Sequence, residues 1–348
     1  QRFKELFNFA VFPFYWASYE KNQGKPEWRK IVPAIEWCKA NGIRTKGHPL
    51  VWTYHAGVPE WLSRYPADVR EELLKARVIN ITAGFKGRID IWDVVNEPLH
   101  GGTWNSPEGA KGPGRIEEIA DYVEPAFRWA YMANPEAQII LNEFHQITDK
   151  TIRERFFELV QELKKRGVPV SGLGIQAHMP GEEWYSPEDL WETFDYFSQL
   201  GYPLHITEFI PQSAGRKITG GWRKGVWTLD AQAEFAEQFY RLCFGHPSIA
   251  SITWWGLTDR YIWLPGGGLT TEEYTPKPAY ETLKRLIHEE WKTSLSAVTD
   301  SEGLVRFRGF YGRYEVKLTT GDGRTHPFKT ALKSKGDNRR VFTVKSSD

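Results

Sequence analysis

Seven short apolar runs with the composition of buried β-strands alternate with segments of helical period before residue 260. The strands are predicted at residues 8–14, 43–52, 89–98, 137–144, 170–178, 203–209 and 249–257. Helices are predicted at 28–41, 59–76, 78–86, 116–133, 151–166, 187–200, 229–244 and 278–290. This alternation requires right-handed crossovers, and it therefore predicts an α/β fold with a parallel sheet covered by helices.

The number of predicted strands is one short of a closed barrel. A barrel of alternating strands and helices contains eight strands, and residues 1–7 have the character of the end of a helix. We therefore expect the first strand to come from upstream of residue 1, as an N-terminal segment or domain that completes the barrel, or from another segment.

The pattern changes after Trp291. Residues 294–348 lose the helical period, and short alternating strands are predicted at 296–300, 304–310, 314–318 and 341–344, with Gly and Asp turns between them. We expect a catalytic barrel at 1–292 and a small antiparallel β-module at 293–348. A carbohydrate-binding role and a spacer or stabilising role are both open for this module.

Two glutamates stand near the ends of predicted strands. Asn96 and Glu97 close the run I-D-I-W-D-V-V before Pro98, and Glu208 lies near the end of a run that Pro211 closes. Pro cannot donate a hydrogen bond to a neighbouring strand, so the chain leaves the sheet there. A lone Glu in such a place is usually an exposed loop residue. Two of them are the groups that glycoside hydrolysis requires, one as proton donor and one as nucleophile or base.

Composition narrows the range of functions. The chain has 16 Trp, 15 Tyr and 20 Phe, which suits a sugar-binding cleft and equally an aromatic core. A net charge of +1 argues against a nucleic-acid or membrane partner held by bulk electrostatics. Cys38 and Cys243 form neither a disulfide framework nor a metal-like spacing. The Gly-rich residues 265–268 are predicted to be a loop, and we expect no metal and no cofactor.

Five motifs occur in the order found in glycoside hydrolase family 10. They are G-H-P-L-V-W at 47–52, W-D-V-V-N-E-P at 92–98, Q-A-H at 176–178, I-T-E at 206–208 and W-W-G-L-T-D-R-Y-I-W at 254–263. From residue 8 to about residue 290 the chain resembles these retaining endo-β-1,4-xylanases. The resemblance implies a (β/α)8 TIM barrel with xylan or xylo-oligosaccharides as substrate, and a secreted or cell-surface location, although no signal opens the chain.

The resemblance also implies roles for individual residues. Glu97 would be the general acid/base and Glu208 the nucleophile, about 5 to 5.5 Å apart as in other retaining sites. Asn96 would bind the 2-hydroxyl of the sugar, and Gln176 and His178 would orient Glu208. His48 is either a sugar contact or a core histidine with its hydrogen bonds satisfied. The remaining predicted substrate-binding residues are Tyr15, Trp52, His55, Asn142, Trp255, Arg260 and Trp263.

The chain departs from the family in two places. Family members usually carry E-N-x-M-K-W after the second barrel strand, whereas residues 11–16 here are V-F-P-F-Y-W. Tyr15 stands where a Lys is expected, so an altered glycone-side subsite is predicted. The family also tends to continue T-E-L-D, with the Asp supporting the histidine, whereas Ile210 occupies that place here.

Three functions remain open. The first is a retaining endo-β-1,4-xylanase, and the second is a retaining β-glycosidase acting on a different β-linked glycan. The third is a catalytically weak carbohydrate-binding barrel. Reducing ends released from xylan would distinguish the first, and sugar binding without turnover would distinguish the third.

Overall fold

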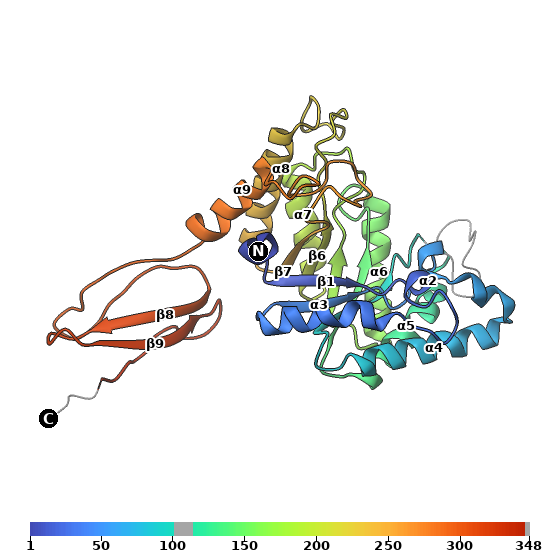
Figure 1. Cartoon of the computed structure of the whole chain (residues 1–348), viewed down its shortest axis with the longest axis horizontal. Coiled ribbons are helices and arrows are strands. Elements are labelled where there is room, and N and C mark those ends of the chain that lie inside the picture. The colour runs from blue at the N-terminus through green and yellow to red at the C-terminus, as the bar shows by residue number, and fades with distance from the viewer. Residues whose placement is uncertain (101–113, 345–348) are drawn as a thin grey trace. The chain divides into compact units, whose positions relative to one another are not determined.

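The computed structural model describes residues 1–100 and 114–344 of the 348-residue chain. It divides into two compact units, residues 1–283 and 284–348. The first unit contains a parallel sheet whose strands follow one another in sequence order (Figure 1). Its strands are β1 (Phe9–Pro13), β2 (Arg44–His48), β3 (Ile91–Asn96), β4 (Gln138–Glu143), β5 (Gly172–Ile175), β6 (Leu204–Phe209) and β7 (Ile249–Trp254). The predicted α/β barrel architecture is confirmed.

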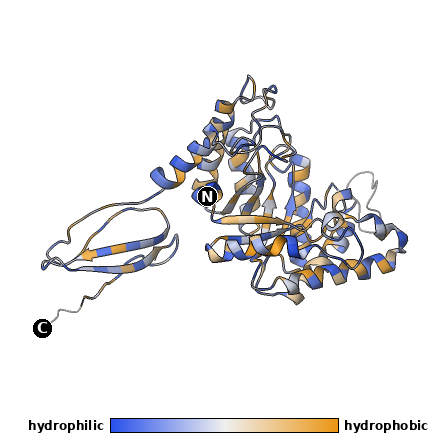
Figure 2. Ribbon diagram, viewed as in Figure 1, coloured by the Kyte–Doolittle hydropathy of each residue, from blue (hydrophilic) through white to orange (hydrophobic). Residues whose placement is uncertain are grey.

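Helices connect the strands and cover the outside of the sheet. The α-helices are α1 (Arg2–Leu6), α2 (Trp16–Tyr19), α3 (Trp28–Ala40), α4 (Ala67–Gly84), α5 (Ile116–Ala133), α6 (Lys150–Lys165), α7 (Pro187–Ser198), α8 (Leu229–Gly245) and α9 (Pro278–Arg285). Short turns of other helical types are η1 (His55–Gly57), η2 (Glu60–Arg64) and η3 (Leu286–Glu290). Hydrophobic and hydrophilic residues alternate along the covering helices (Figure 2), as expected when one face packs on the sheet. No described helix is both long enough and apolar enough to cross a membrane.

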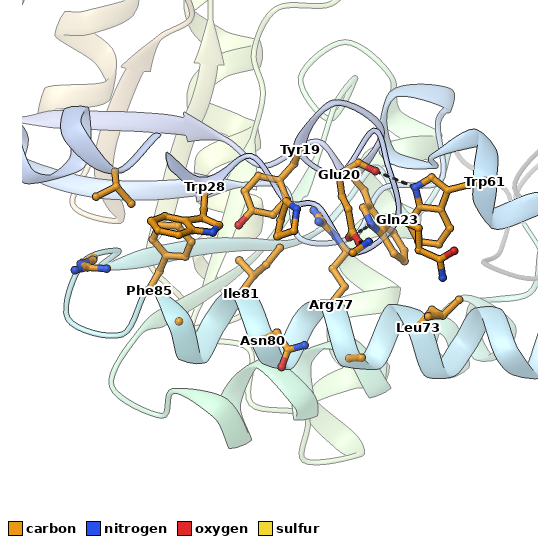
Figure 3. A pocket seen from close by; sticks show the side chains of 17 residues that line it. Tyr19, Glu20, Gln23, Trp28, Trp61, Leu73, Arg77, Asn80, Ile81 and Phe85 are labelled. Carbon is orange, nitrogen blue, oxygen red and sulfur yellow. Dashed lines mark hydrogen bonds between the residues drawn. The ribbon is translucent and has the colours of Figure 1, made fainter. Parts of the chain in front are cut away.

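One helical prediction is wrong in detail. Helix α4 is continuous from Ala67 to Gly84, although the pattern had predicted separate helices on either side of Arg77. The Arg77 side chain is buried and points inward, where it donates hydrogen bonds to the carbonyl oxygens of Phe14 and Leu50. It lies among the aromatic side chains of a cavity of about 620 Å³ between α2, α3 and α4 (Figure 3). Arg77 thus fixes the backbone that follows β1 and β2, directly beside Tyr15.

The sheet is a barrel with one open seam. Strands β1 and β7 each pair with a single neighbour within the described residues. A cavity of about 390 Å³ lies between their free edges, with Phe9 and Val11 on one side and Ile252 and Trp254 on the other. The inner strands β3, β5 and β6 are buried along their whole length, whereas most of β7 is only partly buried. The described residues therefore supply seven parallel strands to the barrel.

The second unit is a two-stranded antiparallel hairpin, β8 (Gly312–Thr319) paired with β9 (Thr325–Leu332). The predicted strand at 314–318 is confirmed, but residues 296–300, 304–310 and 341–344 form no strand. Val298 and Val341 in these segments are 93% and 79% exposed. Alternation forms a strand only where a neighbouring strand pairs with it and buries one face, and Val298 and Val341 stay exposed.

Candidate active site

The two predicted catalytic glutamates lie at the carboxyl ends of β3 and β6, the end of a barrel where active sites form. Glu97 follows the last residue of β3 and has a backbone φ of +55°, which non-glycine residues adopt rarely. Its backbone N–H donates to the carbonyl oxygen of Asn142 on β4 at 2.8 Å. This hydrogen bond and Pro98 turn the chain out of the sheet at the residue that must face the cleft.

Two side chains from the segment directly after β5 join the glutamates. Gln176 donates from Nε2 to Glu97 Oε1 at 2.9 Å, and its Oε1 accepts from His178 Nε2 at 2.5 Å. The same His178 nitrogen lies 3.4 Å from Glu208 Oε2. Between them, Ala177 has a φ of +58°, which brings both neighbours to the same side of the chain. One amide and one imidazole thus bridge the two carboxyl groups, which face one site.

The asparagines form a second bridge. Asn142 donates from Nδ2 to Asn96 Oδ1 and to Glu208 Oε1, each at 2.8 Å, and accepts from the hydroxyl of Thr207 at 2.6 Å. The register explains this contact, since Asn96 on β3 stands directly beside Asn142 on β4. Asn96 also donates to Glu97 Oε1 at 3.1 Å. The predicted site residues Asn96 and Asn142 are therefore brought to both glutamates.

The surroundings shift the two carboxyl groups in opposite directions. Burial raises the pKa of Glu97, and repulsion from the carboxylates of Glu143 and Glu208 raises it further. Burial alone would also raise the pKa of Glu208, but the hydrogen bond from His178 and the positive charges near it outweigh burial and lower it. Between the two pKa values Glu97 holds a proton while Glu208 is charged, which is the division that an acid and a nucleophile need.

His48 belongs to a buried hydrogen-bonded network with Asp93 and Lys46. Its Nδ1 lies 2.7 Å from Asp93 Oδ2, and the same oxygen lies 2.6 Å from Lys46 Nζ. Its other nitrogen, Nε2, lies 4.0 Å from Glu208 Oε1. All three side chains are almost fully buried. Charges in this network lower the pKa of Glu208, and His48 is both paired with Asp93 and placed beside Glu208.

Aromatic side chains surround the acids. Trp52 donates from Nε1 to Glu97 Oε2 at 2.9 Å, and its ring contacts that of Tyr15. The ring of His48 contacts Tyr15 and Trp255, and that of His178 contacts Trp263. The 390 Å³ cavity is lined by the exposed Arg260 and by the rings of Tyr15, His48, Trp255 and Trp263. His55 lies apart, exposed and with its ring against that of Tyr54.

The two family departures have visible structural counterparts. Phe12 is buried in β1 and Ile210 is 2% exposed, so both side chains belong to the core. The Nδ1 atom of His178 is buried and has no hydrogen-bond partner among the described residues. Four further residues join the site although the sequence pattern assigns them no role: Lys46, Asp93, Glu143 and Thr207. Asp93 within an apolar strand and Glu143 beside Asn142 at a strand end were the available signals.

The chain is similar in sequence to known glycoside hydrolases. Residues 13–286 match the model of a family described as "Glycosyl hydrolase family 10". The chain is 28% identical to endo-1,4-beta-xylanase B of Thermotoga neapolitana, over 80% of this chain and 79% of that protein. It is 30% identical to endo-1,4-beta-xylanase A of a Caldicellulosiruptor strain, over 72% of this chain but only 38% of that longer protein.

A solved structure is similar as well. The crystal structure of xylanase 10B from Thermotoga petrophila in complex with xylobiose aligns with a TM-score of 0.68 at 27% identity. The alignment covers 82% of this chain and 87% of that one.

Proposed function

Because the chain belongs to glycosyl hydrolase family 10, we propose that it is a retaining endo-β-1,4-xylanase that hydrolyses the backbone of xylan. The observation that carries the proposal is the pair Glu97 and Glu208, bridged by Gln176 and His178 and shifted in opposite directions in pKa. The xylanases similar to this chain, one of them solved with xylobiose, support xylan as the substrate.

The two glutamates and Asn96 each have a role in the double displacement. Glu208 attacks the anomeric carbon while Glu97 gives its proton to the departing glycosidic oxygen, so a glycosyl ester forms and the first product leaves. Glu97, now charged, removes a proton from water. The water oxygen attacks the same carbon, and Glu208 departs as carboxylate. Asn96, within 2.8 Å of Asn142, is placed to bind the 2-hydroxyl during both steps.

Activity on polymeric xylan tests this function. The purified chain is expected to release reducing ends and short xylo-oligosaccharides from glucuronoxylan and arabinoxylan, with the β-anomer formed first when the products are followed by NMR. A β-1,4-glucan serves as the comparison substrate. Hydrolysis of the glucan or of aryl β-glycosides without xylan cleavage would favour the other β-glycosidase, and binding without turnover would favour a carbohydrate-binding barrel.

We propose further that Tyr15 replaces a charged contact on the glycone side of the cleft. Burial raises the pKa of its hydroxyl, and the charges of Glu208 and Glu97 raise it further, so the group stays protonated as a hydrogen-bond donor. Its ring stands between those of His48 and Trp52. A neutral phenol there holds a sugar through a ring face and one hydroxyl, where family members use a lysine.

Tyr15→Phe tests this subsite. Removing only the hydroxyl is expected to raise KM for xylo-oligosaccharides by roughly two- to tenfold, the value of one hydrogen bond, with a smaller effect on kcat. Tyr131→Phe, on the exposed face of α5, is the matched control. Kinetics on xylotriose and xylopentaose provide the measurement, and an unchanged KM in Tyr15→Phe would show that the hydroxyl makes no substrate contact.

We also propose that a strand from a segment before residue 1 occupies the seam of the barrel. The free edges of β1 and β7 and the 390 Å³ cavity between them support a parallel strand there. A structure of a longer form of the protein with that strand placed elsewhere would contradict this proposal.

A further inference from the structure

A third carboxylate, Glu143, lies behind the loop that carries Glu97. It is the last residue of β4, next to Asn142, and successive side chains of a strand point to opposite faces. Asn142 reaches Glu208, whereas Glu143 turns away from it and is fully buried. A buried carboxylate needs several donors to be tolerated, and its partners show what it holds.

Within the part of the chain that the structure describes, three donors to Glu143 come from the segment after β3 or from its own chain neighbour. One carboxylate oxygen accepts from the backbone N–H of Leu99 at 2.8 Å. The other accepts from the backbone N–H of Phe144 at 2.9 Å and pairs with Nδ1 of His100 at 2.8 Å. Leu99 and His100 follow Glu97 by two and three residues, so Glu143 fastens the loop of the acid/base to β4.

His100 is held in place on two sides. Its ring stacks on that of Phe144 with centroids 3.8 Å apart, and its side chain remains 25% exposed. Solvent protons therefore reach a group that is rigidly paired with a buried carboxylate. Burial lowers the pKa of His100, but the hydrogen bond to Glu143 and the charges of Glu143 and Glu97 outweigh burial and raise it.

We propose that Glu143 and His100 form a charge pair behind the acid/base loop that sets the pH range over which Glu97 retains its proton. The proposal rests on the proposed function and deepens it, since neither residue touches substrate and both act through Glu97. With His100 protonated the pair is neutral, and Glu97 ionises more easily. When His100 loses its proton, the charge of Glu143 is uncompensated and opposes ionisation of Glu97.

Other charges face these groups as well. The negative charge of Glu208 on β6 also raises the pKa of Glu97. His100 faces Asp149, the N-cap residue of α6, and lies near the ring of His145. The charge of Glu208 disappears when the glycosyl ester forms, whereas the pair of Glu143 and His100 keeps its effect on Glu97 throughout the reaction cycle.

Two variants of opposite charge effect test the proposal. Glu143→Gln removes a negative charge, so Glu97 ionises at lower pH. The alkaline limb of the kcat/KM profile, which reports the free enzyme, should move to lower pH. At about one to two pH units above the wild-type optimum, kcat/KM should fall by roughly three- to tenfold relative to wild type. KM at the optimum should stay within about twofold.

His100→Gln keeps a donor for Glu143 but removes the positive charge. The alkaline limb should then move to higher pH, opposite to that of Glu143→Gln. If the two residues had only a structural role, both variants would lose activity, but the alkaline limb of the kcat/KM profile would not move in opposite directions. If both variants keep the wild-type limb, or move it in the same direction, the proposal is overturned. Thermal unfolding of each variant establishes that the fold is retained.

The two proposals can fail separately. A wild type without hydrolysis would contradict the proposed function alone, because the carboxyl of Glu97 can be titrated by carbon NMR without turnover. Opposite shifts of that titration in the two variants would support the charge pair, and unchanged titrations would overturn it.

Discussion

Glu208→Ala is expected to abolish xylan hydrolysis, with kcat reduced on the order of 10⁴-fold or more, because no other group can form the glycosyl ester. The Glu208 carboxylate accepts a hydrogen bond from Asn142 at 2.8 Å and lies beside His178. Asn142 and His178 are both still present in the variant to hold a sugar. Xylo-oligosaccharide affinity, measured by calorimetry, should therefore stay within about an order of magnitude of the wild type.

The matched control for this variant is Glu192→Ala, an exposed glutamate on α7 outside the barrel. It should retain wild-type activity and unfold at the wild-type temperature. Substantial xylan hydrolysis by Glu208→Ala, after removal of any contaminating enzyme, would assign the nucleophile to another residue.

Glu97→Ala should show an effect that depends on the leaving group. Protonation matters most for a poor leaving group, so hydrolysis of xylan should fall by about 10²- to 10⁴-fold. An aryl β-xyloside with an acidic phenol needs no proton, and its glycosyl ester should form rapidly and then accumulate, giving a burst of phenol. Added azide, which attacks without a general base, should speed breakdown of this ester and yield a β-glycosyl azide.

The pH profile provides a second readout for Glu97→Ala. The alkaline limb of kcat/KM on the aryl substrate should disappear, because the group that must be protonated is gone. The acidic limb, which belongs to Glu208, should remain below the usual pKa of a glutamate. Equal losses on xylan and on the aryl substrate would contradict the acid/base assignment.

The sequence was sufficient to predict where the two acids lie but not how they are joined. Pro98 and Pro211 mark strand ends, and parallel strands end at one edge, so the positions of Glu97 and Glu208 followed from local pattern. The Gln176–His178 bridge depends on the left-handed backbone at Ala177, which no periodicity encodes. Such a conformation is held by tertiary contacts rather than by residue type.

Charged residues in apolar settings were the main source of error. Arg77 falls in the gap between the helices predicted at 59–76 and 78–86, whereas α4 is continuous there and buries the Arg77 side chain against Phe14 and Leu50. The pattern around Glu143 gives no sign of burial either, since a strand-end acid is usually solvated. Burial of both became visible only when partners from other elements were in place.

The open seam beside β1 has a consequence for handling the protein. Free backbone groups along F-A-V-F-P are a template for strand addition, and among the described residues no charged side chain of β1 opposes it. Any polypeptide that pairs there binds only the folded state, so the melting temperature becomes a function of that binder's concentration. A second molecule can act as the binder, and the chain should then self-associate through this edge as its concentration rises.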